Sequence, residues 1–258
     1  MNSFDTPVDD STLCGAEAGS VEEAVAGQLA RQSADLAAAG RLMVPDRQLA
    51  DVARQVPADS ALAVSVINSG GAGGLLGLTR RGLAGVRIES AESALRDLDD
   101  LAGNAARVIA AADELDPEIE VFVELPFAPR WEAAVEVVEA AGRSAKIIAG
   151  SDGVRLAEQL SILIEADCGF KVQLGDDPRS ADRWQLAVAV DALIEGSSIS
   201  EAAGLLAADD DQERARDLVQ GWDDVTRRRV LRRLRRLALN RTRRDDVRPA
   251  GSRRPTAP

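Results

Sequence analysis

The sequence predicts an α/β protein, in which a TIM-barrel-like (β/α) domain is followed by a helical C-terminal extension. Between about residues 40 and 180, short apolar runs alternate with helical segments, the order typical of a parallel sheet with crossover helices. Several of these runs also alternate aliphatic and polar residues, as strands do when helices cover only the outer face of a barrel. Six strands are visible in the sequence. We therefore expect a TIM-barrel-like domain, either complete or reduced to six or seven strands; the alternative is an open doubly wound parallel sheet.

The same patterns divide the chain of 258 residues into four segments. Residues 1–20 are polar and acidic and lack the basic start and apolar run of a signal peptide, so we expect a disordered N-terminal segment. The barrel-like domain then spans 21–180, the helical extension 181–244 and a disordered tail 245–258. No apolar run approaches the roughly 18–20 residues that a membrane helix needs, and we expect a cytoplasmic protein.

Capping and turn residues separate the elements of the predicted barrel. Alanine-rich helical spacing ends before Gly40, a residue type common just after a helix, and Asp46 is placed to cap the next helix. The glycine-rich run 69–74 must form a loop. We expect, in order, a helix at 21–39, a strand at 41–45, a helix at 46–56, strands at 61–68 and 85–90, a helix at 91–115, a strand at 118–126, a helix at 130–141, a strand at 144–150, a helix at 152–166 and a strand at 168–175.

Beyond residue 180 the pattern is helical, with no visible strand. The last helical segment, Arg227–Arg244, has a stripe of leucines among arginines. Residues 227–258 contain 13 arginines and two aspartates, a net charge of +11, which leaves −23 on the rest of a chain whose net charge is −12. We expect this basic helix to dock on the acidic body, on a second copy or on a protein partner. Nucleic acid is disfavoured, because no aromatic residues are interleaved to stack on bases.

Missing residue types limit the chemistry. Histidine and tyrosine are absent, which excludes a histidine-based triad, a histidine-ligated metal and a tyrosine acid. Cys14 and Cys168 are the two cysteines and lie too far apart in sequence for a thiolate zinc site. We therefore expect neither a metal nor a cofactor.

Two lysines stand out among 31 basic residues, of which the other 29 are arginine. Lys146 and Lys171 both lie inside short apolar runs that predict buried strands. A lysine in such a place is a compact amine suited to a pocket rather than to a solvated surface. The two residues therefore indicate a site.

Strand periodicity predicts which side chains enter the barrel. Aliphatic residues should face the helices, so the polar residues between them should face inward. Glu124, Lys146 and Lys171 lie on three consecutive strands and are expected to be neighbours. The inward polar set is Ser65, Arg87, Glu89, Glu124, Lys146, Lys171 and Gln173, with Asp176 and Asp177 following at the mouth.

This set supports two kinds of chemistry. A lysine shielded from water near another cation has a lowered pKa and can attack a carbonyl carbon. We expect Lys171 to be the central amine, Lys146 its electrostatic partner and Glu124 the proton carrier, with Ser65, Arg87, Glu89, Gln173, Asp176 and Asp177 binding substrate. Alternatively, the basic groups bind an anionic ligand, or Glu124 and Lys146 form a purely structural ion pair.

The stretch from Gly40 to about Asp209 resembles a family of uncharacterised bacterial proteins, mainly actinobacterial, that form a β/α barrel. The family strands read roughly VFVEVP, AKIRTGG and FKATAGLHHP; here they read VFVELP at 121–126, AKIIAGS at 145–151 and FKVQLGDDP at 170–178. The resemblance implies a barrel in which Glu124, Lys146 and Lys171 match the acidic and lysine positions. The His-His pair is replaced by Asp176 and Asp177, which implies a rewritten site.

Two functions remain open from the sequence. The first is a barrel that binds a small anionic or carbonyl metabolite, as a lysine-dependent lyase, aldolase or isomerase. The second is a degenerate, non-catalytic barrel that acts as an accessory or protein-interaction factor, which the missing histidines and the added basic helix favour.

Overall fold

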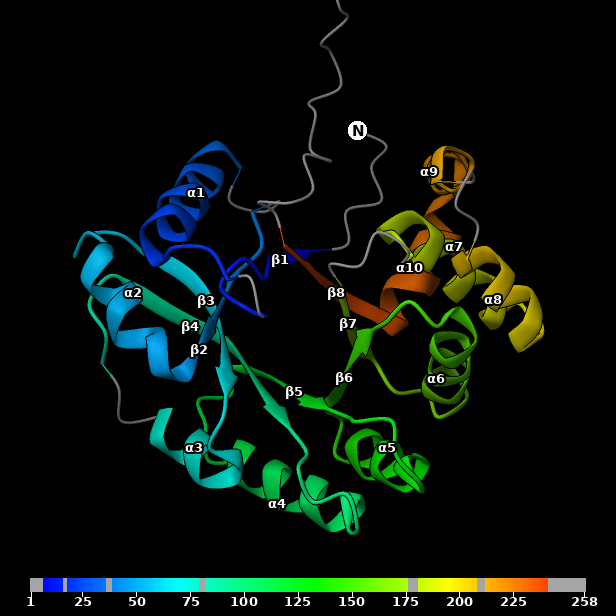
Figure 1. Cartoon of the computed structure of the whole chain (residues 1–258), viewed down its shortest axis with the longest axis horizontal. Coiled ribbons are helices and arrows are strands. Elements are labelled where there is room, and N and C mark those ends of the chain that lie inside the picture. The colour runs from blue at the N-terminus through cyan, green and yellow to red at the C-terminus, as the bar shows by residue number, and fades with distance from the viewer. Residues whose placement is uncertain are drawn as a thin grey trace, which may run out of the picture.

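Eight parallel strands form a closed barrel in chain order, β1 to β8 (Figure 1). The computed structural model describes residues 7–15, 18–35, 39–78, 82–175, 181–207 and 212–240. The TIM-barrel-like prediction is confirmed, the barrel is complete, and the open doubly wound alternative is wrong. The strands are β1 (Val8–Asp10), β2 (Leu42–Pro45), β3 (Leu62–Asn68), β4 (Val86–Ala94), β5 (Glu120–Glu124), β6 (Ser144–Ala149), β7 (Phe170–Leu174) and β8 (Leu234–Leu239).

Helices surround the barrel, and aspartates begin several of them. Asp100, Asp152 and Asp182 each accept a backbone N–H in the first turn of the helix that follows, which satisfies donors that a helix start leaves free. The helices are α1 (Val21–Ala34), the short 3₁₀ helix η1 (Asp46–Gln48), α2 (Leu49–Gln55), α3 (Gly71–Leu78), α4 (Leu101–Ala112), α5 (Trp131–Ala140), α6 (Gly153–Glu165), α7 (Arg183–Ile194), α8 (Ile199–Ala207), α9 (Gln212–Gly221) and α10 (Asp224–Arg233).

The first and last strands lie where the sequence predicted none. Residues 1–20 were expected to be disordered, yet β1 pairs with both β2 and β8. The single helix expected at Arg227–Arg244 is also wrong, because α10 ends at Arg233 and β8 begins at once. Leu231, Leu234 and Leu237 are spaced as on one face of a helix, so the sequence pattern does not indicate the short strand β8. The extension therefore supplies the strand that closes the barrel.

A β-bulge changes which side chains of β4 face the interior of the barrel. Val64 pairs with Ile88 and Ser65 with Ser90, so Glu89 is an extra residue between them. After the bulge, the alternation of inward and outward residues shifts by one position. The strand also continues to Ala94, and α4 starts at Leu101, whereas a helix was expected from residue 91.

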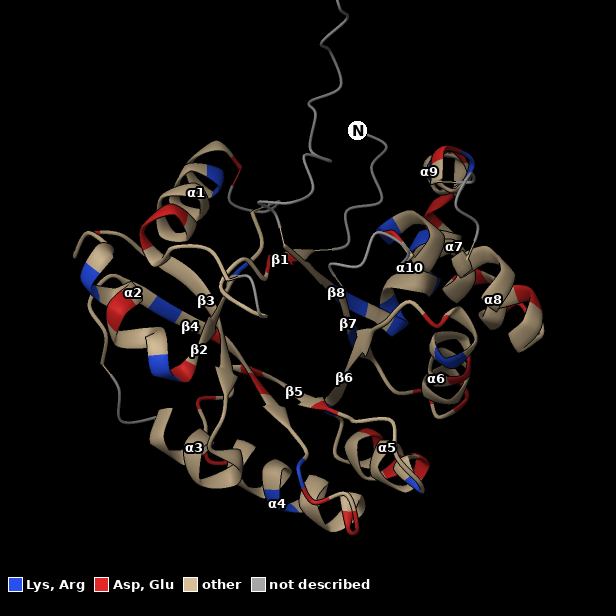
Figure 2. Ribbon diagram, viewed as in Figure 1, with Lys and Arg blue, Asp and Glu red and all other residues tan. Residues whose placement is uncertain are grey.

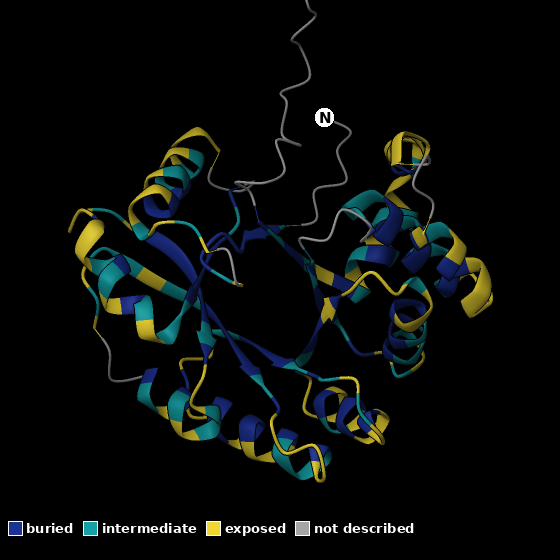
Figure 3. Cartoon of the chain, in the orientation of Figure 1, coloured by how far each residue is buried: buried dark blue, intermediate teal, exposed yellow. Residues whose placement is uncertain are grey.

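The apolar core lies between the strands and the helices. The strands are mostly buried while the outer helix faces are exposed (Figure 3). Val230 of α10 and Leu237 of β8 belong to this core, and Arg229 of α10 contacts Asp191 of α7 at 2.6 Å. The basic segment thus docks on the body of its own chain through apolar and ionic contacts. Within the described residues, no helix is both long and apolar enough to cross a membrane.

Replacing Leu237 by alanine tests the eighth strand. Leu237 is 1% exposed, so Leu237→Ala should lower the free energy of unfolding by about 2–5 kcal/mol, because it removes buried methyl groups and leaves a cavity. Leu98→Ala is the control, since Leu98 is 54% exposed and should cost little. Urea unfolding of both variants makes the comparison; equal, small effects would contradict the placement of β8.

Candidate functional site

The structure brings Glu124, Lys146 and Lys171 together inside the barrel. Glu124 of β5 pairs in register with Lys146 of β6, which pairs with Lys171 of β7. Lys146 Nζ lies 2.8 Å from Glu124 Oε2. Among the described residues, Lys171 makes no ion pair with Glu124. A different carboxylate lies between the two lysines and contacts both of them.

That carboxylate is Glu92 of β4, which the predicted inward polar set lacks. Its Oε1 lies 2.6 Å from Lys171 Nζ, and its Oε2 lies 2.7 Å from Lys146 Nζ. Ser65 donates a hydrogen bond of 2.7 Å to Oε1 and accepts one of 2.8 Å from Ser90. Glu92 faces inward because the bulge at Glu89 shifts the alternation of β4. Ser65, expected to bind substrate, is instead fully buried against this carboxylate.

Asp9 of β1 is the second buried carboxylate at Lys171. Lys171 Nζ lies 2.5 Å from Asp9 Oδ2, and neither side chain is exposed. Asp9 Oδ1 accepts from the backbone N–H of Arg41 at 3.0 Å and lies 3.2 Å from Arg236 Nη1 of β8. β1 therefore supplies a carboxylate partner to the lysine, and β8 supplies a cation to that carboxylate.

Further ion pairs continue toward the amino end of the barrel, where the strands begin. Glu120 Oε2 lies 3.4 Å from Arg236 Nε and 2.9 Å from Arg41 Nη1. Arg41 Nε lies 3.0 Å from Glu89 Oε2, and Arg87 Nη2 lies 2.6 Å from Glu89 Oε1. Figure 2 shows charged positions on the barrel strands as well as on the outer helices.

These contacts join into one continuous series of opposite charges, here called the ion-pair chain. Each neighbouring pair is 2.5–3.4 Å apart, and acidic and basic groups alternate throughout. Its ten members, from the amino end to the carboxyl end, are Arg87, Glu89, Arg41, Glu120, Arg236, Asp9, Lys171, Glu92, Lys146 and Glu124. Five positive and five negative charges neutralise one another along it.

Burial and pairing fix the charge state at the centre. Burial alone would raise the pKa of Glu92, but the ammonium groups of Lys171 and Lys146 outweigh it and lower the pKa to about 2. Burial alone would lower the pKa of Lys146, but Glu92 and Glu124 outweigh it and raise the pKa above its ordinary value. Lys146 therefore stays an ammonium at neutral pH, which agrees with the electrostatic role expected for it.

The remaining predicted binding residues are divided between the two ends of the barrel. Arg87 and Glu89 lie at the amino end, away from the carboxyl ends of the strands where barrel enzymes bind substrate. Gln173 follows Lys171 on β7 and is half-buried toward the carboxyl end. Asp176 and Asp177 lie outside the described residues.

Solvent reaches the ion-pair chain at its carboxyl end through Glu124. The Glu124 side chain is 22% exposed, whereas Lys146 is 2% exposed and Glu92 and Lys171 are fully buried. Ile148, two residues beyond Lys146 on β6, is 51% exposed. The thiol of Cys14, in the loop after β1, is not a nucleophile at neutral pH, because burial raises its pKa to about 12.

No family model, curated protein or solved structure matches the chain. The resemblance to the actinobacterial barrel family accordingly stays a prediction. Among the described residues, no group of three or more histidine, cysteine, aspartate or glutamate side chains is arranged to hold a metal ion.

Glu92→Gln tests the centre of the ion-pair chain. The substitution leaves two buried ammonium groups without their shared carboxylate, so it should lower the free energy of unfolding by about 3–5 kcal/mol at pH 7. Because the folded pKa is about 2 and the ordinary value is 4.5, the carboxylate stabilises the fold fully above about pH 4.5. Its contribution falls as the pH drops toward 2, so the difference between variant and wild type should shrink over that range.

The measurement is urea unfolding at several pH values between 3 and 7. Glu136→Gln serves as the control, since Glu136 lies on an exposed position of α5. A Glu92→Gln cost that is small, or that does not change with pH, would show that the carboxylate is not held ionised by the lysines.

Proposed function

We propose that the barrel binds a small carbonyl metabolite at its carboxyl end and transfers a proton there, as isomerases, aldolases and lyases do. The observation that supports this is the contact between Glu124, partly exposed at that end, and the buried Lys146 ammonium group. Active sites of (β/α)₈ barrels lie at the carboxyl ends of the strands. A carboxylate beside a cation at this end is the pair that proton abstraction next to a carbonyl group needs.

The two residues would take complementary roles. Glu124 removes a proton from the carbon next to the carbonyl group, and the electron pair moves onto the carbonyl oxygen. The Lys146 ammonium group stabilises the resulting enolate, a charge that develops only as the reaction proceeds. Glu124 then returns the proton to the same or the neighbouring carbon. Lys171 acts as a positioning residue, because it contacts Asp9 and Glu92 and is fully buried.

This assignment changes the role expected for Lys171, from the central amine to a positioning residue. Lys146 keeps the electrostatic role expected for it, because its raised pKa favours the ammonium form. The Lys171 side chain has no exposed surface, which leaves no path for a carbonyl carbon to reach its amine. Among the expected ligands, a carbonyl compound fits better than an anion, because the ion-pair chain ends here in the carboxylate of Glu124.

Exchange of carbon-bound hydrogen tests the proposal. In D₂O, small keto-acids, aldehydes and sugar phosphates are incubated with the protein, and loss of the proton next to the carbonyl group is followed by NMR. Glu124→Gln should slow this exchange by about 10²–10⁴-fold while leaving ligand-induced thermal stabilisation in place. Glu132→Gln, at an exposed position of α5, should leave the rate unchanged.

Borohydride in the same samples separates the covalent route from the enolate route. We expect no reduced adduct on either lysine, and an adduct at Lys146 or Lys171 would favour the amine chemistry instead. If no carbonyl compound binds or exchanges, or if Glu124→Gln exchanges as fast as wild type, the proton-transfer proposal fails.

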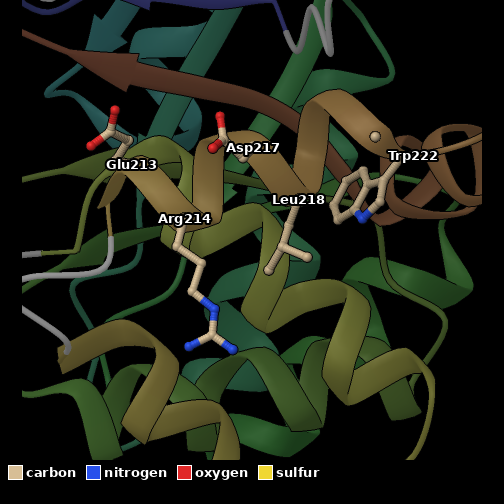
Figure 4. A pocket seen from close by; sticks show the side chains of 6 residues that line it. Glu213, Arg214, Asp217, Leu218 and Trp222 are labelled. Carbon is tan, nitrogen blue, oxygen red and sulfur yellow. The ribbon is translucent and has the colours of Figure 1, made fainter.

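A non-catalytic barrel is the second candidate, and the paired state of the lysines favours it. Each lysine already has two carboxylate partners, so the ion-pair chain is satisfied without a ligand. Such a protein would act through its surface. A shallow depression of about 770 Å³ lies along α9, where Glu213 and Asp217 point to one side and Arg214 and Leu218 to the other (Figure 4).

A further inference from the structure

A second cavity lies at the amino end of the barrel, opposite the mouth that contains Glu124. Its volume is about 140 Å³, and its lining includes Gln32, Arg41, Ala63, Arg87, Glu89 and Arg236. Pockets for drug-sized ligands are roughly 300–1,000 Å³. This cavity is therefore sized for a single small group rather than for a whole metabolite of that class.

The lining has an excess of positive charge. Three arginines enter it, and Glu89 is the acidic residue among the lining side chains. Both oxygens of Glu89 are already engaged, Oε1 by Arg87 at 2.6 Å and Oε2 by Arg41 at 3.0 Å. Glu120 contacts Arg41 and Arg236, and Asp9 contacts Arg236, so these carboxylates offset part of the arginines' charge. Asp9 also contacts Lys171. The ion-pair chain thus ends at the amino end in a cation, Arg87.

Donor groups remain available on these arginines. Arg41 uses Nε and Nη1 for its two glutamates, and Arg236 uses Nε and Nη1 at the longer distances of 3.4 and 3.2 Å. The Nη2 groups of both have no hydrogen-bond partner among the described residues. The Arg87 side chain is 55% exposed and pairs with Glu89 alone in the described part of the chain. The guanidinium groups can therefore donate to a further acceptor.

We propose that the amino-end cavity binds a small tetrahedral oxyanion, for which inorganic phosphate is the simplest probe. Planar guanidinium groups with several donors match the oxygens of phosphate, and such charge-assisted hydrogen bonds are stronger than neutral ones. Three arginines around one small cavity provide this chemistry from three different strands or strand starts, β2, β4 and β8. The site does not depend on the carbonyl chemistry proposed for the opposite end.

Phosphate binding by the full chain tests the proposal. Isothermal titration and thermal unfolding are carried out with sodium phosphate, with sodium chloride at the same ionic strength as the reference. Arg87→Gln should weaken phosphate binding about tenfold, the loss expected for one charge-assisted hydrogen bond. Arg107→Gln is the matched control, because Arg107 on α4 is also 55% exposed and also pairs with carboxylates. It should bind phosphate as wild type does.

A second variant fills the cavity without changing a charge. Ala63 lies at the start of β3 and is 4% exposed, so Ala63→Val places two methyl groups against the space that the anion would occupy. It should lose most of the phosphate-induced rise in melting temperature. Phosphate stabilisation no larger than that of chloride, or equal binding by wild type and Arg87→Gln, would overturn the proposal. Neither result would affect the proton-transfer proposal, which is tested separately by exchange of the substrate's carbon-bound hydrogen.

Discussion

The mutual neutralisation of ten charged side chains is the constraint on which the barrel depends. A buried ion without a partner costs several kcal/mol, so the buried members of the ion-pair chain, Asp9, Lys171, Glu92 and Lys146, need the oppositely charged groups on both sides. Glu92 shows this most clearly, since one of its oxygens contacts Lys146 and the other contacts Lys171. An ordinary barrel interior is filled by branched aliphatic side chains, and here salt bridges occupy that place.

This constraint explains why both ends of the described chain belong to the barrel. Asp9 comes from β1 and Arg236 from β8, and they contact each other across the seam that closes the sheet. Without β1, the buried Lys171 would lose the carboxylate of Asp9, and without β8, the buried Asp9 would lose the guanidinium group of Arg236. The same order of charges gives the barrel unlike ends, with the cation Arg87 at one and the carboxylate Glu124 at the other. The two proposed ligand sites differ for that reason.

The sequence was sufficient for the fold class and for part of the site. Periodicity predicted that Glu124, Lys146 and Lys171 face inward, because β5 to β7 alternate regularly. The inward position of Glu92 was not predicted, because the extra residue at Glu89 reverses the alternation and no residue pattern at the bulge itself indicates it. The one indirect indication is that the aspartates at 97, 99 and 100 fit a later helix start, which leaves Glu92 in the strand. The role of Asp9 was not predicted, because β1 has three residues, two of them acidic, and it is stabilised by pairing with a strand far away in the sequence.

The pKa of Lys146 is the quantity that shows whether the carboxylates of the ion-pair chain hold a buried lysine as a cation. The chain has two lysines, so labelling with ¹³C,¹⁵N-lysine gives two side-chain signals, and Lys146→Arg identifies the one from Lys146. We expect the Lys146 signal to keep its ammonium shift as the pH rises through the ordinary value of 10.5. A titration midpoint below that value would contradict the ion-pair chain, because it would show that Glu92 and Glu124 do not hold Lys146 as a cation.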